Sequence, residues 1–247
     1  IKAALERAAK ECGYEGGFSV VISVENGEEL ALQTYNSHLG IVGGISILGT
    51  SGIVEPMSEK ALVDTIRLEL DSLYAQGQRI AFLCPGNYGA DFARDTLGLD
   101  LERAVKCSNY IGEAFDHAVC CGYSDILLVG HAGKLVKIAA GVMNTHSSVA
   151  DARQEIFTAH AALCGAGRKT LELLMQAVSV DACIELLDRE SVRERVMARI
   201  QDEMEKRIAR RLKGRAAAEF IMFTTKYGVL AQSAGAARLC EKLRKNL

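Results

Sequence analysis

The sequence has no uninterrupted apolar run of about 18 residues, the length that a membrane-spanning helix needs. No signal-peptide pattern opens the chain, and no low-complexity tract interrupts it. A net charge of −2 gives no general reason to bind nucleic acid. We therefore expect a cytoplasmic protein that binds neither membranes nor nucleic acid.

The chain has 8 cysteines, but no two of them form a C-x-x-C pair. At this chain length, irregular spacing indicates buried thiols in a reducing compartment rather than a disulfide framework. Cys120 and Cys121 are neighbours, and neighbouring side chains on a helix point about 100° apart, which is awkward for shared metal binding. His131 and His146 lack a third ligand at suitable spacing. The sequence therefore predicts no metal site.

Hydrophobic residues make up 49% of the chain, which is enough for a substantial core. Strand, loop and helix patterns alternate over residues 79–142 with short connections, which favours parallel strands and right-handed crossovers. Residues 149–215 are predicted to be helical, and residues 219–232 predict a closing hairpin before a last helix. We predict an α/β fold whose largely parallel central sheet is flanked by helices. A helical region and a C-terminal β-hairpin plus helix then follow.

The predicted organisation has a boundary near residue 148. Residues 1–148 would form an α/β domain with glycine-rich ligand loops, and residues 149–247 a helical segment and closing hairpin packed on it. One continuous domain is the alternative. Near the N-terminus, residues 18–24 and 29–35 predict a hairpin around an Asn-Gly turn, and residues 45–48 predict a buried strand.

A glycine-rich stretch follows that hairpin and precedes a predicted helix that starts near Ser58. Its backbone N–H groups could cradle an anion or a nucleotide, because glycines let the chain approach a ligand closely. A tight turn between packed elements is the alternative. Glu55 could accept ribose hydroxyls, or could merely lead into the helix. The candidate residues of the loop are Gly43, Gly44, Gly49, Thr50 and Gly52.

The segment from Gly130 to Lys134 also joins a predicted strand to a predicted helix. It is not the phosphate loop of nucleotide hydrolases, because Leu135 stands where Ser or Thr would hold magnesium. It does place His131 at a helix N-terminus and Lys134 and Lys137 in the first turns, which favours bound anions. A capped helix with two solvated lysines is the alternative.

Other polar candidates lie near predicted strand ends. His146 could meet His131 across these ends and act as a proton shuttle, or could be structural. Arg153 could grip a carboxylate with two hydrogen bonds. Tyr88, which follows Asn87, could stack on a planar ligand or pack within its own loop.

Four long motifs occur in a fixed order over most of residues 40–156, and together they resemble the CbiD family. The family comprises the cobalt-precorrin-5B C(1)-methyltransferases of anaerobic cobalamin biosynthesis. Its members carry a further N-terminal segment, so the resemblance implies that site residues within that segment are absent here. The motifs are GGISILGTSGIVEPMSEKAL at 43–62, CPGNYG at 84–89, VGHAGKLVKIAAGVMNTHS at 129–147 and ADARQEI at 150–156.

The resemblance implies methylation of C-1 of cobalt-precorrin-5B to give cobalt-precorrin-6A. S-adenosyl-L-methionine is the implied methyl donor, and cobalt enters only as part of the tetrapyrrole substrate. A dinucleotide-dependent oxidoreductase is one alternative, although no G-x-G-x-x-G turn follows the first predicted strand. A non-catalytic tetrapyrrole-binding protein is another. The sequence does not indicate an oligomeric state.

On this interpretation the glycine-rich loop and Glu55 would bind the donor. Cationic side chains would face one cleft and bind the carboxylates of the macrocycle, and His131 or His146 would accept a proton from it. The expected substrate-binding residues are Asn87, Tyr88, Lys134, Lys137 and Arg153.

Overall fold

The computed structural model describes residues 1–34, 41–47 and 59–245 of the chain. It divides into two compact units, residues 1–54 and residues 55–247. The predicted boundary near residue 148 stays a prediction. None of the helices in the described part of the chain is long and apolar enough to cross a membrane.

The described residues of the N-terminal unit form two helices, α1 (Lys2–Cys12) and α2 (Gly27–Ala31). The predicted hairpin is wrong, because residues 18–24 form no strand and the second strand is replaced by α2. Both faces of residues 18–24 are exposed to solvent, with Val20 49% and Val21 87% exposed. The apolar side chains of this segment therefore have no core to pack against. Residues 45–47 also form no strand, whereas residue 48 lies outside the described residues.

The sheet of the larger unit has the strand order β2-β1-β3-β4-β5. The pairs β2–β1, β1–β3 and β3–β4 are parallel, and β4–β5 is an antiparallel hairpin. This confirms the predicted fold class. The strands are β1 (Ile80–Leu83), β2 (Ala104–Val105), β3 (Asp125–His131), β4 (Ala217–Thr224) and β5 (Gly228–Gln232).

Side chains of the central strands alternate between two buried clusters, one on each face of the sheet. Leu83 and Leu128 belong to the larger cluster, which α3, α5 and α10 cover, while Phe82 and Val129 belong to the smaller one, which α4 and α11 cover. Buried on both faces, the strands are continuous apolar runs, as in other parallel sheets. The covering helices are α3 (Glu59–Ala75), α4 (Asn87–Asp95), α5 (Ile111–Cys121), α10 (Arg193–Leu212) and α11 (Ala236–Arg244).

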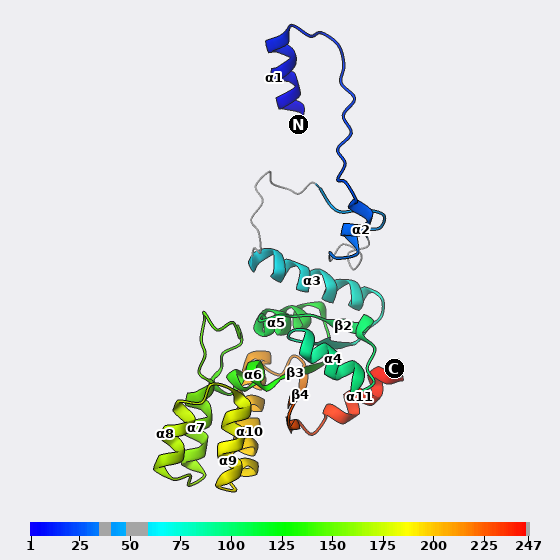
Figure 1. The fold of residues 1–247 in the computed structure, drawn as a ribbon. Helices are drawn as coiled ribbons and strands as arrows, with labels where there is room; N and C mark the ends of the chain where they lie inside the picture. Colours follow the sequence, from blue (N-terminus) through cyan, green and yellow to red (C-terminus); the bar gives the residue numbers. More distant parts are fainter. Residues whose placement is uncertain (35–40, 48–58, 246–247) are drawn as a thin grey trace. The chain divides into compact units, whose positions relative to one another are not determined.

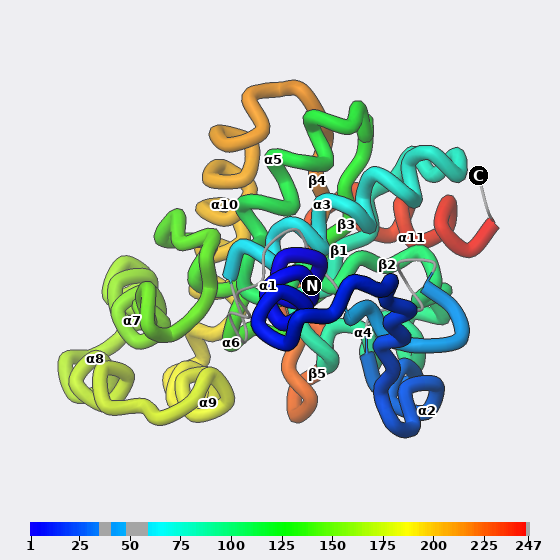
Figure 2. The backbone as a smooth tube through the Cα atoms, turned by 90° about the horizontal axis from the view of Figure 1, so that it is seen from above, coloured from blue at the N-terminus to red at the C-terminus, as the bar shows by residue number. Residues whose placement is uncertain are grey.

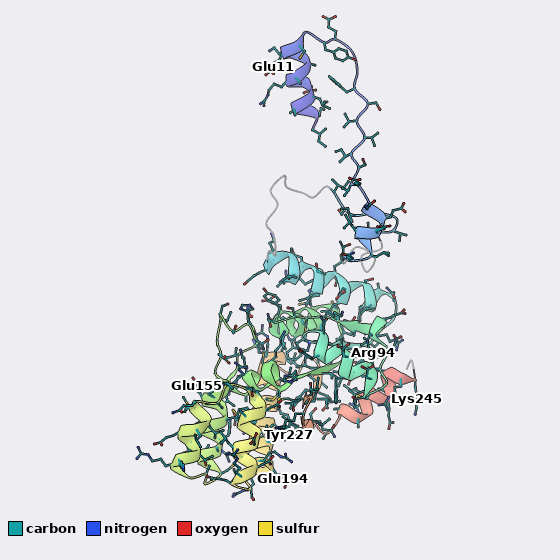
Figure 3. The ribbon with its side chains drawn as sticks, viewed as in Figure 1. Glu11, Arg94, Glu155, Glu194, Tyr227 and Lys245 are labelled. Carbon is teal, nitrogen blue, oxygen red and sulfur yellow. The ribbon has the colours of Figure 1, made fainter. Side chains whose placement is uncertain are left out.

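The helical region gathers to one side of α10 (Figures 1 and 2). The predicted apolar stripe of α10, from Val196 to Leu212 in steps of four, is buried throughout. It drifts by about 40° per step, and α10 accordingly packs against several elements, including α5, α7, α9, β4 and β5. Glu155 of α7 and Glu194 of α10 project into solvent (Figure 3). The region contains α7 (Arg153–Leu163), α8 (Arg168–Met175) and α9 (Val180–Arg189).

Short 3₁₀ and α turns complete the fold. The helix predicted over residues 133–142 is instead one α turn followed by a 3₁₀ turn that ends at Gly141 in the left-handed conformation, with φ 82°. These short elements are α6 (Ala132–Leu135), η3 (Val136–Ala140) and η2 (Leu101–Arg103).

Candidate active site

The chain reverses its direction of travel across the sheet between β1 and β3. From β1 it continues to β2 on one side, and from β2 it crosses over β1 to reach β3. The segment after β1 leads to α4 on one face, while that after β3 leads to α6 on the other. Ligands of such sheets bind in the crevice outside the carboxyl ends of the strands at this point.

A cavity of about 470 Å³ lies at this switch point. Its volume suits one drug-sized molecule. The loop after β1, the start of α6, the start of α7 and the start of α9 form its walls, so the fold assembles it from segments distant in sequence. The lining residues are Pro85, Gly86, Asn87, Tyr88, His131, Gly133, Lys134, Arg153, Ser179, Val180 and Asp181.

Lys134 provides a half-buried cation that no described carboxylate pairs with. Its Nζ donates one long hydrogen bond, of 3.4 Å, to the carbonyl oxygen of Ser108. Burial lowers the pKa of Lys134 below its ordinary value, because the charged form loses water without gaining a counter-ion. An anionic ligand in the cavity would supply that counter-ion.

Two glycines shape this wall, Gly86 in the loop after β1 and Gly89 in the first turn of α4. Gly86 has a φ of 101°, a conformation that side-chain-bearing residues rarely adopt, and its missing Cβ would lie in ordinary contact, 3.4 Å from Lys134 Nζ. A Cβ on Gly89 would lie 2.6 Å from the carbonyl oxygen of Val129, so glycine also lets α4 begin directly beside β3. No side chain caps α4, and its first-turn N–H groups add positive potential at Asn87 and Tyr88.

Arg153 reaches the cavity already paired with Asp151. Its Nε and Nη2 donate to the two carboxylate oxygens of Asp151, with 2.6 Å for Nη2–Oδ2. This bidentate contact with Arg153 lowers the pKa of Asp151 below its ordinary value. The guanidinium therefore lines the cavity with a partly compensated charge.

His131 enters the cavity with a fixed tautomer. It caps α6, and its Nδ1 accepts a hydrogen bond of 3.1 Å from the backbone N–H of Gly133. A backbone N–H can only donate, so Nδ1 carries no proton and the neutral ring bears its hydrogen on Nε2. Burial lowers the pKa of His131 below 6.5, with the charge of Asp181 acting in the opposite direction. His131 therefore presents a neutral N–H donor.

Asp181, in the first turn of α9, is a cavity residue that the sequence patterns did not indicate. Its Oδ1 is buried and has no hydrogen-bond partner among the described residues. In sequence it is an ordinary acid at the start of a helix, far from the other cavity residues. Only the packing of the helical region against the sheet brings it near His131.

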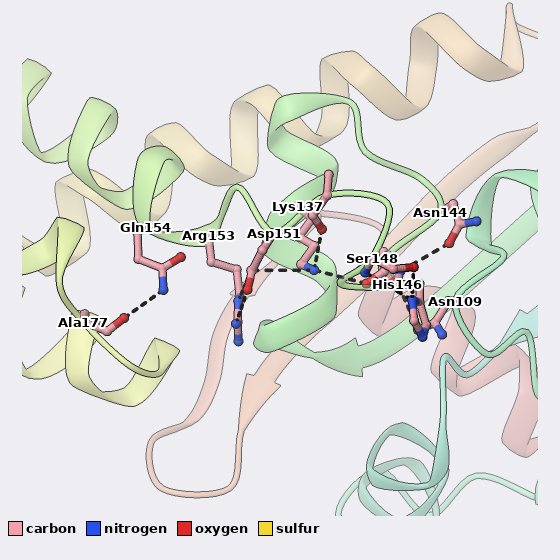
Figure 4. A network of polar contacts seen from close by, with 11 residues as sticks. Asn109, Lys137, Asn144, His146, Ser148, Asp151, Arg153, Gln154 and Ala177 are labelled. Carbon is pink, nitrogen blue, oxygen red and sulfur yellow. Dashed lines mark hydrogen bonds and ion pairs between the residues drawn. The ribbon is translucent and has the colours of Figure 1, made fainter.

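Lys137 does not face this cavity, so the expectation of one cleft shared with Lys134 is wrong. It is 3% exposed, and its Nζ donates to the carbonyl oxygens of Thr145 at 3.1 Å and Ala150 at 2.8 Å. It also lies 3.7 Å from Oδ1 of Asp151 (Figure 4). Lys137 therefore anchors the loop of residues 141–152. A role for Lys137 in binding the substrate stays a prediction.

His146 lies on that anchored loop and is exposed. Its Nδ1 lies 2.6 Å from Oγ of Ser148, and its backbone N–H donates to Oδ1 of Asn144 at 3.2 Å (Figure 4). Ser148, rather than Thr145 or Ser147, orients the ring. His146 is not among the lining residues of the cavity, so the two histidines do not share it. A role for His146 in proton transfer stays a prediction.

The expected donor loop falls largely outside the described residues. Gly43 and Gly44 are described and belong to no regular element, while Gly49, Thr50, Gly52 and Glu55 are not among the described residues. Binding of a methyl donor by this loop therefore stays a prediction.

A second cavity, of about 500 Å³, lies at the starts of α3 and α5. Two of its cations are already paired, Arg67 with Glu113 at 3.0 Å and Arg211 with Asp116 at 2.7 Å. Its third cation, Lys60, is exposed, whereas Lys134 in the cavity at β1 and β3 is half-buried. The cavity at β1 and β3 also lies directly at the strand ends and is therefore the stronger candidate.

Comparisons with known proteins point to one family. The family model described as CbiD matches residues 1–56, and the one described as CbiD, C-terminal domain, matches residues 144–234. A protein of Ruminiclostridium cellulolyticum named cobalt-precorrin-5B C(1)-methyltransferase is 50% identical over 224 residues, covering 91% of this chain and 58% of the relative. A protein of Alkaliphilus metalliredigens with the same name is 39% identical over 241 residues, covering 97% and 64%.

The third relative, from Thermoanaerobacter sp., bears the same name and is 47% identical over 176 residues, covering 71% of this chain and 48% of its own length. The chain thus spans about half to two thirds of the length of these curated relatives. No solved structure matches the chain.

Proposed function

Because the chain belongs to the CbiD family, we propose that it catalyses the reaction for which its relatives are named, methylation of C-1 of cobalt-precorrin-5B. The methyl donor would be S-adenosyl-L-methionine, which supplies an activated methyl group and leaves as S-adenosylhomocysteine. The product would be cobalt-precorrin-6A, in the biosynthesis of cobalamin. Action in the cytoplasm is part of this proposal, and the 8 free cysteines support it.

The assignment of the cavity rests on the half-buried ammonium of Lys134, which no carboxylate of the described residues pairs with. The tetrapyrrole is fringed by carboxylates, and a carboxylate beside Lys134 would restore the charge balance that burial disturbs. The first-turn N–H groups of α4 and the guanidinium of Arg153 would add donors for the same or a neighbouring carboxylate.

Cavity size supports a division of the two ligands. A volume of about 470 Å³ suits one drug-sized molecule, whereas methyl transfer needs the donor and the macrocycle together. The cavity would therefore take a carboxylate-bearing edge of the macrocycle, with Tyr88, which is 71% exposed, against the ring. Binding of the donor by the glycine-rich loop and Glu55 is the other part of this proposal.

The residues of the chain act by holding and orienting, since an activated methyl group needs no protein nucleophile. Cations and N–H donors fix the ring edge, and closure of the site would exclude water. Nε2–H of His131 would donate to an oxygen of the substrate. Where a proton must leave the ring, the unpartnered Oδ1 of Asp181 offers an acceptor, whereas Nδ1 of His131 is already occupied.

The test is methyl transfer by the full chain from methyl-labelled S-adenosyl-L-methionine to cobalt-precorrin-5B. The relative from Ruminiclostridium cellulolyticum serves as the positive control for the substrate preparation. Label should enter the macrocycle with the wild type and enter more slowly with Lys134→Ala, while Lys169→Ala, which changes an exposed lysine of α8, should match the wild type.

Two outcomes would contradict the proposal. If the relative transfers label and this chain does not, the assigned reaction is wrong. If the chain binds the macrocycle but neither binds nor consumes the donor, it is a non-catalytic tetrapyrrole-binding protein. A dinucleotide-dependent oxidoreductase would instead change the absorbance of an added nicotinamide cofactor.

A further inference from the structure

Asp71 of α3 and His117 and Cys121 of α5 bring three different ligand atoms together, away from the cavity described above. Nε2 of His117 lies 2.9 Å, and Sγ of Cys121 3.1 Å, from Oδ1 of Asp71. All three atoms lie within 4.8 Å of one another. The side chains are accessible, with 57% of the Asp71 and 22% of the His117 side chain exposed.

The two helices hold this cluster firmly in place. His117 and Cys121 are four residues apart on α5, so they point in the same direction. Tyr123, which is buried just after α5, donates from its hydroxyl to the carbonyl oxygen of Leu70 at 2.9 Å. Because Leu70 precedes Asp71, this bond and the packing of α3 on α5 keep the carboxylate opposite the imidazole and the thiol.

We propose that these three side chains form a binding site for one zinc ion. Imidazole nitrogen, thiolate sulfur and carboxylate oxygen are the three ligand types that zinc takes in proteins. A tetrahedral ion with ligands at about 2.0–2.3 Å holds them roughly 3.3–3.8 Å apart, so Oδ1 of Asp71 needs to move only slightly away from the imidazole and the thiol. The carboxylate and the thiolate would neutralise the ion, and a water molecule would complete its coordination at the exposed side.

Without a metal, the same atoms satisfy each other. Asp71 Oδ1 accepts from the thiol of Cys121 and lies at hydrogen-bond distance from the ring nitrogen of His117. Zinc would replace both hydrogen bonds and release the thiol proton, so binding should weaken as the pH falls. Serine at position 121 and glutamine at position 117 can keep such hydrogen bonds, yet neither is a good zinc ligand.

The position of the cluster assigns the zinc a structural task. The last turn of α5 leads directly into the start of β3, so the cluster lies near the amino ends of the strands, whereas the cavity lies at their carboxyl ends. A zinc ion there would tie α3 to α5 without touching the macrocycle. Its binding should therefore stabilise the fold and leave methyl transfer independent of added zinc.

The experiment uses the full chain without a polyhistidine tag, dialysed against zinc chloride after metal depletion. We expect one zinc per wild-type chain. Cys121→Ser and His117→Gln should each lower the affinity by more than the ~10–100-fold that loss of an outer-shell partner costs. Cys120→Ser is the matched control, because this neighbouring exposed thiol points away from the cluster and should leave the affinity unchanged.

Substitution of cobalt(II) for zinc provides an independent spectroscopic test of the same site. The wild type and Cys120→Ser should show a sulfur-to-cobalt charge-transfer band that Cys121→Ser lacks, and zinc should raise the Tm of only the first two. Circular dichroism checks that each variant is folded. The proposal is overturned if the wild type binds no zinc, or if folded Cys121→Ser and His117→Gln bind it as tightly as the wild type does.

Discussion

Two polar regions within residues 131–153 use their lysines in opposite ways. At the cavity, Lys134 is half-buried and makes one long hydrogen bond. On the loop of residues 141–152, Lys137 is buried, makes two hydrogen bonds and lies near Asp151. The two lysines are three residues apart and are indistinguishable by charge, so the surroundings of each ammonium, rather than its presence, decide whether it is available for a ligand.

The largest expected effect is a loss of stability in Lys137→Met. The substitution leaves the carbonyl oxygens of Thr145 and Ala150 without their donor and removes a cation beside Asp151, at an expected cost of about 3 kcal/mol. Urea denaturation would measure it, with Lys169→Met as the exposed control. A loss below about 1 kcal/mol would show that this loop does not depend on its buried cation.

Lys134→Ala should have the next largest effect, on substrate rather than on stability. Loss of a charged hydrogen bond to a carboxylate corresponds to about 1.5–3 kcal/mol, a rise in the dissociation constant of the macrocycle of roughly 10–100-fold. The free energy of unfolding should change little, because this lysine has no carboxylate partner among the described residues. Titration with the macrocycle measures the dissociation constant, and a denaturation curve measures the free energy of unfolding. If Lys134→Ala were strongly destabilised while its affinity stayed unchanged, Lys134 would be a structural lysine and the contrast with Lys137 would be wrong.

A smaller effect is expected where the two regions meet, in Arg153→Lys. Lysine cannot reproduce the bidentate contact with Asp151, but this carboxylate is partly exposed, so the loss should stay within about 1 kcal/mol. The pKa of Asp151 is lowered in the folded state, so the contact stabilises the protein above the ordinary carboxyl pKa and is lost as the pH falls through the folded value. Acid denaturation should begin at higher pH in the variant, and coinciding curves would contradict this.

The smallest expected effect is on the titration of His131. Its pKa should lie below 6.5, because burial disfavours the imidazolium, and Asp181→Asn should lower it further by removing a nearby negative charge. The unfolded chain then binds a proton more readily than the folded one, so the contribution of His131 to stability falls as the pH drops below the ordinary value. Nuclear magnetic resonance of the ring protons checks both; a pKa above 6.5 would contradict the buried, neutral ring.

Local patterns predicted much of the larger unit. Apolar runs marked β1 and β3, and the steps of four from Val196 to Leu212 marked the buried face of α10. Such patterns are reliable where burial is set by neighbours in the chain. In residues 18–24 the same reasoning failed, because a strand needs a partner and a covered face, and alternation supplies neither.

Local sequence patterns did not predict which side chains from distant segments lie close together. No feature of the sequence around Asp181 indicates that it lies near His131. The four-residue spacing of His117 and Cys121 does indicate that they share a helix face. No feature of the sequence around Asp71 indicates that it faces these two side chains.

The sequence by itself determined the fold class, the family and the segments that carry the candidate site, because hydrophobic periodicity and long ordered motifs are local properties of a chain. Only the tertiary structure decided that Lys134 faces a cavity and Lys137 does not, that Nδ1 of His131 is occupied, and that Asp181 joins the site. The physical reason is that burial and hydrogen-bond partners depend on which distant segments pack together, and these set the charge, the tautomer and the availability of each side chain.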